Sequence, residues 1–381
     1  MQILLMAEPF KHLINAALVR DAAKHLEQVD ARFKAKPFIA RVVPQLDALE
    51  LKARAMCVAD ALDASLPAEF DDAATLLERA MAPVGVREDG PVMHLAENGL
   101  SGWFLWSVGE YAARRGVHHP ERALRFLHAL TQRFTAEFAI RPLIVAHPRL
   151  VYDTLTGWTK DPSEHVRRLV SEGTRPRLPW GLQLKTLITD PSPSWPLLEA
   201  LLDDPSEYVR RSVANHLNDI AKDHPALVAH WVERHLPEAS AERRALLRHA
   251  SRTLIKKGDR RTLQAWGLGA PFLGRATFHV KPRRIVLGDA LTLTLELTST
   301  AKSAQTLVID YVVHHVKADG STSPKVFKGW TLELPARGER TLQRKHSVKP
   351  ITTRRYHAGV HRVEIQINGN VVAEDTFRLS L

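Results

Sequence analysis

Glu172 is the side chain whose position most favours a chemical role over a structural one. It lies in the last turn of an expected helix, directly before Gly173, where the helix dipole makes a carboxylate mildly unfavourable. Helix stability therefore does not explain it, and a carboxylate can stabilise a developing positive charge or orient a water molecule. The alternative is an ordinary salt bridge to Arg168, one helical turn earlier.

Two further carboxylates are candidates for the same chemistry. Asp219 follows Arg211 and Asn215 at four-residue steps, so these three side chains share one face of a helix. Glu137 precedes Arg141 by one helical turn. A solvated surface acid is the alternative for Asp219, and an ion pair with Arg141 is the alternative for Glu137.

Trp180 is the aromatic residue best placed to contact a substrate. It follows the segment Arg175–Pro179, whose two prolines predict a loop. An exposed indole there could stack on a base or contact a sugar. The alternative is a core tryptophan that covers a helix end.

Other aromatic and acidic residues rank lower. Trp103 and Trp106 share a helical face with Glu110 and are predicted to pack in the interior. Asp153 and Trp158 are second candidates for the acidic and the aromatic role.

Arginine side chains cluster around the same segments. A guanidinium binds phosphate oxygens through two parallel hydrogen bonds, so these residues are candidate phosphate contacts. Two of them, Arg168 and Arg211, could instead form a ladder with acids between helical repeats. The candidates are Arg141, Arg168, Arg175, Arg177 and Arg211, with Lys317, Lys325, Lys328, Arg354 and Arg355 in the last third of the chain.

The net charge of +11 indicates a polyanionic partner. Acidic residues outnumber basic ones over residues 1–100, whereas basic residues are in excess over 101–270 and over 271–381. Basic surface binds DNA by releasing counterions, whatever the base sequence. A solvated basic surface without a partner is the alternative.

Several classes of protein are disfavoured by what the sequence lacks. There is no His-Glu-x-x-His or Cys-x-x-Cys set, so we expect no metal and no cofactor, and adjacent histidines such as His118 and His119 are predicted to lie at the surface. Cys57 is the single cysteine, which fits a reducing compartment. With no apolar run long enough for a membrane helix and no export signal, we expect a cytoplasmic protein, nucleoid-associated when it is bound to DNA.

The chain divides into a helical part and a strand-rich part. Before about residue 268, apolar positions recur at three- and four-residue spacing, most clearly over Leu100–Gly116, Pro120–Ala146 and Pro205–Lys222. After Gly274, short alternating runs separated by turns such as Asn368-Gly369 predict about seven strands and a sandwich. The predicted domains are a HEAT-like α-solenoid over 1–268 and an immunoglobulin-like β-sandwich over 269–381.

The helical part contains a repeat. The segment Asp161–Arg168, Asp-Pro-Ser-Glu-His-Val-Arg-Arg, returns 43 residues later as Asp204–Arg211 with one change, His to Tyr. This period is typical of HEAT-type repeats. In each copy Asp is predicted to cap the helix and Glu to complete a capping box. Stacked copies would align their polar stripes on one curved surface, the usual binding face of a solenoid.

These motifs resemble a known family. The segments Met6–Lys11 and Glu164–Trp180, together with the 43-residue repeat, are similar to the AlkC-type DNA alkylation repair proteins, a branch of the AlkC/AlkD HEAT-like-repeat DNA glycosylases. The resemblance covers residues 6–268, and the β domain matches the AlkC members that have an immunoglobulin-like domain.

The resemblance implies a hydrolase of base excision repair. Such an enzyme removes cationic alkylated bases, particularly 3-methyladenine and 3-methylcytosine, from double-stranded DNA without base flipping. An N3-alkylated base already carries positive charge and leaves without a general acid, so carboxylates need only stabilise the sugar cation and position water. On this interpretation Glu137, Glu172 and Asp219 are catalytic, Trp180 contacts the lesion, and the protein acts as a monomer.

Two functions from other classes remain open on the sequence alone. Solenoids often serve as non-catalytic scaffolds, and a structure-specific DNA-binding protein would show the same charge and salt dependence. Carboxylates clustered within a basic groove would favour the enzyme, since DNA binding alone gains nothing from acids placed against phosphates.

Overall fold

The computed structural model describes residues 10–85, 95, 98–268, 270–351 and 354–381. Most of the opening motif Met6–Lys11 therefore lies outside the described residues. By their contacts the residues form two compact units, 1–223 and 224–381. The sequence-based domain boundary at 268/269 stays a prediction.

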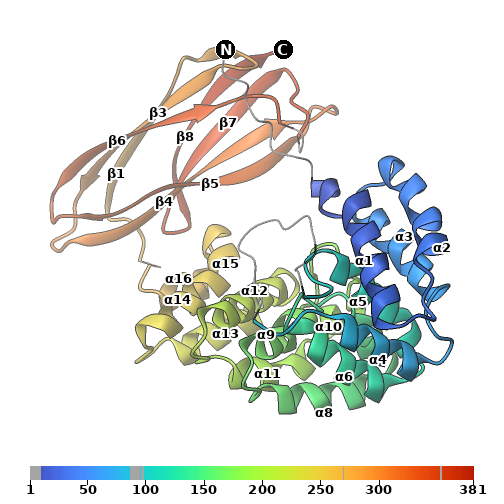
Figure 1. The fold of residues 1–381 in the computed structure, drawn as a ribbon. Coiled ribbons are helices and arrows are strands. Elements are labelled where there is room, and N and C mark those ends of the chain that lie inside the picture. Colours follow the sequence, from blue (N-terminus) through green and yellow to red (C-terminus); the bar gives the residue numbers. More distant parts are fainter. Residues whose placement is uncertain (1–9, 86–94, 96–97, 269, 352–353) are drawn as a thin grey trace. The chain divides into compact units, whose positions relative to one another are not determined.

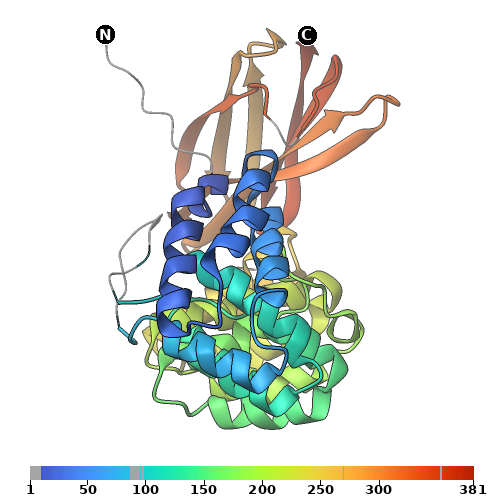
Figure 2. The same ribbon diagram turned by 45° about the vertical axis from the view of Figure 1, so that its right-hand side comes forward.

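The first unit is helical, and its successive helices are coloured from blue to green in Figures 1 and 2. Among the described residues, a 3-10 helix at Phe10–Leu13 precedes them, and two others, at Val43–Ala48 and Ser192–Ser194, lie between them. The α-helices are α1 (Ala16–Val29), α2 (Ala35–Val42), α3 (Leu51–Asp63), α4 (Phe70–Ala80), α5 (Phe104–Gly116), α6 (Pro120–Thr131), α7 (Ile140–Ala146), α8 (Pro148–Trp158), α9 (Glu164–Gly173), α10 (Lys185–Thr189), α11 (Trp195–Ala200) and α12 (Glu207–Asp223).

The predicted helix over Pro120–Ala146 is wrong in one respect, because it is interrupted. α6 ends at Thr131, residues 132–139 form turns, and α7 begins at Ile140. The interruption contains neither proline nor glycine, so composition gave no signal for it. Because of this interruption, Glu137 lies outside the helix that contains Arg141, and the four-residue spacing no longer places the two side chains on one helical face.

The repeated segment forms the same turn before α9 and before α12, although not the predicted capping box. The N-cap of α9 is Ser163 and makes no side-chain cap bond. Instead the Asp161 carboxylate accepts the backbone N–H of Ser163 at 2.8 Å, and Asp204 accepts that of Ser206 at 2.9 Å. Each aspartate thus stabilises a local turn directly before the following helix and so sets the direction of that helix.

The first arginine of the Arg-Arg pair forms an ion pair between the two copies. Arg167 donates to both carboxylate oxygens of Asp204, at 2.7 and 3.1 Å. α9 and α12 pack side by side. The apolar side chains along one face of α12 are all buried, namely Val209, Val213, Leu217 and Ile220.

The second unit contains the last helices and all eight described strands. The helices are α13 (Pro225–His235), α14 (Ala241–Ala250), α15 (Arg252–Lys256) and α16 (Arg260–Ala265). The strands are β1 (Gly274–Lys281), β2 (Arg284–Val286), β3 (Ala290–Ser299), β4 (Gln305–Val316), β5 (Thr322–Leu334), β6 (Glu339–Ser347), β7 (Gly359–Ile367) and β8 (Asn370–Ser380). A helical region followed by a β domain confirms the predicted fold class.

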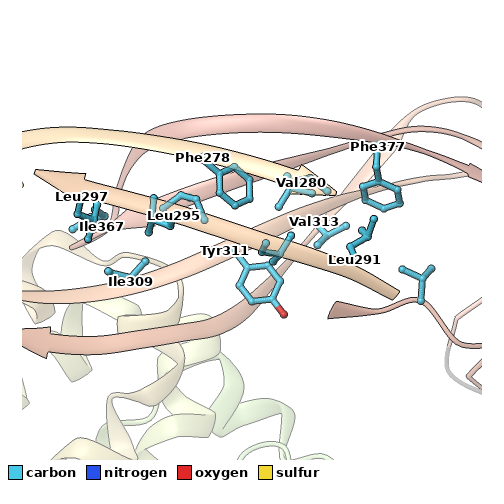
Figure 3. Packing of buried hydrophobic residues seen from close by; sticks show 14 of the residues in the cluster. Phe278, Val280, Leu291, Leu295, Leu297, Ile309, Tyr311, Val313, Ile367 and Phe377 are labelled. Atoms are coloured by element: carbon cyan, nitrogen blue, oxygen red, sulfur yellow. The ribbon is translucent and has the colours of Figure 1, made fainter. Parts of the chain in front are cut away.

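The strands form two sheets, in the orders β1-β3-β6 and β2-β8-β7-β4-β5. Figure 3 shows their core, where Phe278 and Leu295 from one sheet meet Ile309 and Phe377 from the other. Alternate residues of β3 are buried, as the pattern of apolar residues requires. The hairpin predicted at Asn368-Gly369 joins β7 to β8, and both turn residues have positive φ, as a two-residue hairpin turn needs.

Across the part of the chain that the structure describes, each helix is too short or too polar to cross a membrane.

Three histidines are buried within the β-sandwich without charged partners. His315, His346 and His361 are all more than nine-tenths buried. Burial, with Arg354 and Lys325 nearby, lowers the pKa of His315 to about 3 and that of His346 to about 4. These imidazoles are therefore neutral in the folded domain.

Acidification is expected to destabilise the sandwich through these histidines. Unfolded histidine binds a proton near pH 6.5, so below that pH the unfolded chain holds more protons than the folded one, and the free energy of unfolding falls. His315→Phe should reduce this pH dependence by up to ~1.4 kcal/mol per pH unit in urea unfolding between about pH 7.5 and 5. His279→Phe, at an exposed position on β1, is the control; equal pH dependence in both variants would contradict the expectation.

Candidate active site

Three acidic and three basic side chains alternate along one chain of ion pairs in the helical unit. The order is Glu137, Arg168, Glu172, Arg175, Asp219 and Lys222. All three acids are buried, between 1 and 6% exposed. The three carboxylates predicted from the sequence are therefore brought together.

Glu137 forms the first link, with Arg168 of α9. Arg168 donates to both carboxylate oxygens of Glu137, at 3.0 and 3.3 Å, and to the hydroxyl of Thr135 at 2.7 Å. Burial raises the pKa of Glu137, although Arg168 acts in the opposite direction. The guanidinium group of Arg168 also lies over the ring of Tyr208, whose centre is 5.2 Å from the guanidinium carbon.

Glu172 lies at the centre of the chain, with both oxygens engaged. Oε1 accepts from Arg175 at 2.5 Å and lies 3.7 Å from Arg168, while Oε2 accepts the hydroxyl of Ser212 at 2.6 Å. These partners lie on α9, on the following loop and on α12. Glu172 thus joins three segments.

Asp219 is the most deeply buried of the three acids, at 1% exposure. Oδ2 accepts from Nε of Arg175 at 2.8 Å, and Oδ1 accepts from the ammonium group of Lys222 at 2.7 Å. Arg175 is therefore fixed between Glu172 and Asp219. A buried charge is stable only when it is paired and hydrogen-bonded in this way.

Arg141 holds the loop that follows α9. It is wholly buried and donates to the backbone carbonyls of Gly173 and Leu182. Burial, followed by the nearby charge of Arg175, lowers the pKa of Arg141 to about 10. The loop between these carbonyls contains Trp180.

Trp180 presents its indole to solvent, with 65% of the residue exposed. Its φ is +64°, a left-handed conformation that a bulky residue adopts only under external constraint. Lys52 of α3 supplies one constraint by donating to its carbonyl oxygen at 2.8 Å. The core alternative raised by the sequence is therefore wrong.

The indole of Trp180 belongs to a stack of three aromatic rings. Its ring is parallel to that of Trp106, with centroids 6.4 Å apart, and Trp106 stacks in turn on Phe138 at 5.4 Å. Trp106 is 3% exposed and donates from Nε1 to Glu110, which confirms its predicted packing role. Phe138 directly follows Glu137, so the stack and the ion-pair chain share one short segment.

Comparisons with known proteins agree with this geometry. Residues 131–254 match the family model described as DNA alkylation repair enzyme, and residues 275–381 match the C-terminal Ig-like domain of the uncharacterised protein YhaZ. The chain is 34% identical to YhaZ of Bacillus subtilis (strain 168) over 95% of its own length and 96% of that protein. It is 33% identical, with a TM-score of 0.89, to the Pseudomonas fluorescens alkylpurine DNA glycosylase AlkC bound to DNA containing an abasic site analog, covering 98% of this chain and all of that one.

The chain belongs to the AlkC family of DNA alkylation repair proteins. The resemblance found in the sequence is therefore confirmed, and so is the Ig-like nature of the β domain.

The arginines of this AlkC-family chain divide into two groups. Arg141 and Arg175 are buried, Arg168 is partly buried, and all three bind other groups of the protein, so they are less suited to contact phosphate than the more exposed arginines. Arg177 is one-third exposed and pairs with Asp223, and Arg211 is 62% exposed and pairs with Glu207. Phosphate binding by Arg177 and Arg211 stays a prediction.

The second-ranked candidates have other neighbours. Asp153 is exposed on α8, beside His147 and Arg149. The ring of Trp158 lies 5.3 Å from that of His128. Among the described residues, no group of three or more His, Cys, Asp or Glu is arranged to hold a metal ion.

Sequence reasoning missed two residues of this site: Ser212, whose hydroxyl donates to Glu172, and Lys222, which pairs with Asp219. Ser212 occupies the repeat position of Leu169, so a buried apolar residue in one copy is replaced by a hydroxyl in the next. This departure within an otherwise matching repeat was the available signal. Lys222 follows Asp219 by three residues, a spacing that also brings side chains together on a helix, so it could have been found from the sequence.

Removing Arg175 is expected to destabilise the helical unit strongly. Arg175→Met would leave Glu172 and Asp219 without their shared partner in a buried site, which should lower the free energy of unfolding by about 3–5 kcal/mol. Arg177→Met breaks a partly exposed pair in the same loop and should cost about 1 kcal/mol or less. Urea unfolding of the two variants tests this. Similar losses of unfolding free energy in both would show that the buried ion pairs add no more stability than a partly exposed pair.

Proposed function

We propose that this protein is a DNA glycosylase of base excision repair that hydrolyses the N-glycosidic bond of cationic alkylated bases, in particular 3-methyladenine and 3-methylcytosine, in double-stranded DNA without base flipping. The observation that supports it most is the cluster of three buried carboxylates beside an exposed tryptophan. A surface that only bound DNA would gain nothing from acids held against phosphates. The related AlkC protein, whose structure contains DNA with an abasic site analog, points to the same chemistry.

The reaction breaks the bond between the sugar C1′ and the base nitrogen. The bonding electrons pass to the cationic base, which leaves neutral, and a water oxygen bonds to C1′ while its proton passes to a carboxylate or to solvent. Positive charge develops on the sugar during bond breaking, and fixed carboxylates in a water-poor site stabilise it most effectively. A leaving base that is already cationic needs no proton from the enzyme.

Glu137 and Glu172 are the acids we assign to the reacting sugar and water. Each keeps 8% of its side chain exposed, whereas Asp219 keeps 2%. Asp219 contributes its negative charge to the site and holds Arg175 against Glu172. The hydrogen bonds fix all these groups before substrate arrives, so little reorganisation is needed during the reaction.

Trp180 is assigned to the lesion or the exposed sugar. Its indole is the largest apolar surface that the loop presents, and the Trp106 stack beneath it limits its motion. An electron-rich ring face attracts a cation, which favours a cationic base over its neutral counterpart.

Replacing the carboxylates with amides is expected to abolish most base release. Glu137→Gln, Glu172→Gln and Asp219→Asn keep the side-chain shape but remove negative charge, so release of 3-methyladenine from methylated duplex DNA should fall ~10²–10³-fold. Mass spectrometry of free bases measures it. Glu207→Gln, an exposed acid on α12, is the matched control.

Binding must be followed in the same variants with an undamaged duplex. Base release that collapses while duplex affinity stays near that of the unmodified chain supports the glycosylase. Binding by the unmodified chain with no release from any methylated DNA would contradict it and favour a scaffold or a recognition protein.

Trp180→Ala is expected to slow base release ~10-fold, since stacking of an aromatic side chain on a base contributes about 1–3 kcal/mol. Trp180→Phe should recover part of the rate. The control is Leu182→Ala, which removes another exposed apolar side chain from the same loop. Single-turnover rates measure the effect, and equal rates for Trp180→Ala and Leu182→Ala would remove the lesion-contacting role.

A further inference from the structure

Three buried polar side chains lie along one side of α12 at the candidate site. Ser212, His216 and Asp219 are separated by four and three residues, which places them on one face of the helix. Each is at most 3% exposed. Ser212 and Asp219 belong to the ion-pair site described above, whereas His216, which lies between them in the sequence, has no part in the proposed reaction so far.

His216 uses one of its two ring nitrogens. Nδ1 lies 3.0 Å from the backbone carbonyl oxygen of Ser171, and because a carbonyl only accepts, Nδ1 carries the hydrogen. Burial lowers the pKa of His216 to about 4, so the ring is neutral and Nε2 carries no hydrogen. Nε2 is buried and has no hydrogen-bond partner in the part of the chain that the structure describes. The bond to Ser171 is therefore what an apolar side chain at this position would lose.

The carbonyl of Ser171 is left without its helical partner where α9 ends. In a continuing helix it would accept the backbone N–H of Arg175, but that N–H bonds to the carbonyl of Glu172 instead. The hydroxyl of Thr174 lies farther away than His216, at 3.3 Å. Since Ser171 is wholly buried, its carbonyl requires a donor from another element, and His216 supplies it.

α12 thus holds Glu172 at both ends. The Ser171 carbonyl belongs to the peptide group that joins Ser171 to Glu172, so the bond from His216 fixes the backbone from which this acid projects. Ser212 fixes the carboxylate itself, by donating to Oε2 at 2.6 Å. A shift at either end would move the acid relative to a reacting sugar, and misplacement by about 1 Å can cost ~10²-fold in rate.

The repeat places this contact in the second copy alone. The position of His216 corresponds to Gly173 in the first copy, 43 residues earlier, where α9 ends, whereas α12 continues to Asp223. Glycine has no side chain that could reach a neighbouring carbonyl. A buried imidazole also costs desolvation that an apolar side chain would avoid, so packing alone does not explain a histidine here.

We propose that His216 is a positioning residue for base release, which orients Glu172 through the Ser171 carbonyl without touching the substrate. Its chemical meaning rests on the proposed function, whereas the Nδ1 hydrogen bond rests on the structure alone. The role requires the neutral ring with its hydrogen on Nδ1.

Three substitutions separate the hydrogen bond from the bulk of the ring. His216→Leu removes the donor and should lower the single-turnover rate of 3-methyladenine release ~10–100-fold while duplex affinity stays unchanged. His216→Asn places an amide N–H where Nδ1 lies and should keep most of the rate. The longer side chain in His216→Gln misplaces the donor, so this variant should be as slow as His216→Leu.

His25→Leu is the matched control, because it removes a histidine bond to the carbonyl of Ala80 between α1 and α4 of the same unit. Loss of rate in His216→Leu and His216→Gln, but not in His216→Asn or His25→Leu, supports the proposal. Equal rates in His216→Asn and His216→Gln overturn it, and this comparison still decides if His216→Leu does not fold. Duplex affinity that falls as much as the rate also overturns it, since the histidine then serves binding or folding.

Nitrogen NMR of histidine-labelled protein tests the bond independently of activity. At about pH 5.5 exposed histidines are mostly protonated, whereas His216 should stay neutral with its hydrogen on Nδ1. The signal is assigned by its loss in His216→Asn, and a hydrogen on Nε2 overturns the proposal. If the unmodified chain releases no base from methylated DNA, the proposed function fails and the positioning role with it, while the NMR result still shows whether His216 holds the Ser171 carbonyl.

Discussion

The candidate site depends on one electrostatic constraint, which is that three buried carboxylates can stay ionised close together only when a cation lies between neighbouring acids. Arg168 separates Glu137 from Glu172, and Arg175 separates Glu172 from Asp219. Removing charges from water costs several kcal/mol per ion, and only close, multiply hydrogen-bonded pairing offsets this cost. The positions of α9, α12 and the loop between α9 and α10 must therefore satisfy these contacts together.

The HEAT-like repeat supplies the framework, and the site arises where the repeat is broken. Both copies build the same aspartate turn, and Arg167 links one copy to the next. At the position of Leu169, however, the second copy has Ser212, whose hydroxyl binds Glu172. The second copy therefore has a buried hydroxyl group where the first has a buried apolar side chain, and this hydroxyl takes part in the candidate site.

Sequence reasoning grouped the three acids as candidates and paired Glu172 with Arg168, as the structure does, but it gave Glu137 the wrong partner. The resemblance and local motifs placed Glu137, Glu172 and Asp219 in one site, where the structure brings them together. The pair of Glu137 with Arg141, raised as the alternative to a catalytic role, assumed an unbroken helix, and the break over residues 132–139 has no proline or glycine to mark it. Tertiary pairing with Arg168 determines that turn, and a local pattern cannot report a contact 31 residues away. The left-handed backbone of Trp180 is likewise imposed by Lys52 and Trp106, which come from other helices.

The same pairing bears on which bases the proposed enzyme could remove. To expel a neutral base, an enzyme usually needs a carboxylic acid that donates a proton, as glycosidases do with an acid of raised pKa. Burial raises the pKa of Glu137, yet both of its oxygens accept hydrogen bonds from Arg168. A carboxyl group held as a double acceptor has no proton directed at a leaving group. The arrangement can stabilise a sugar cation but is poorly suited to protonating a base, so the charge that makes the base leave must already be on the lesion.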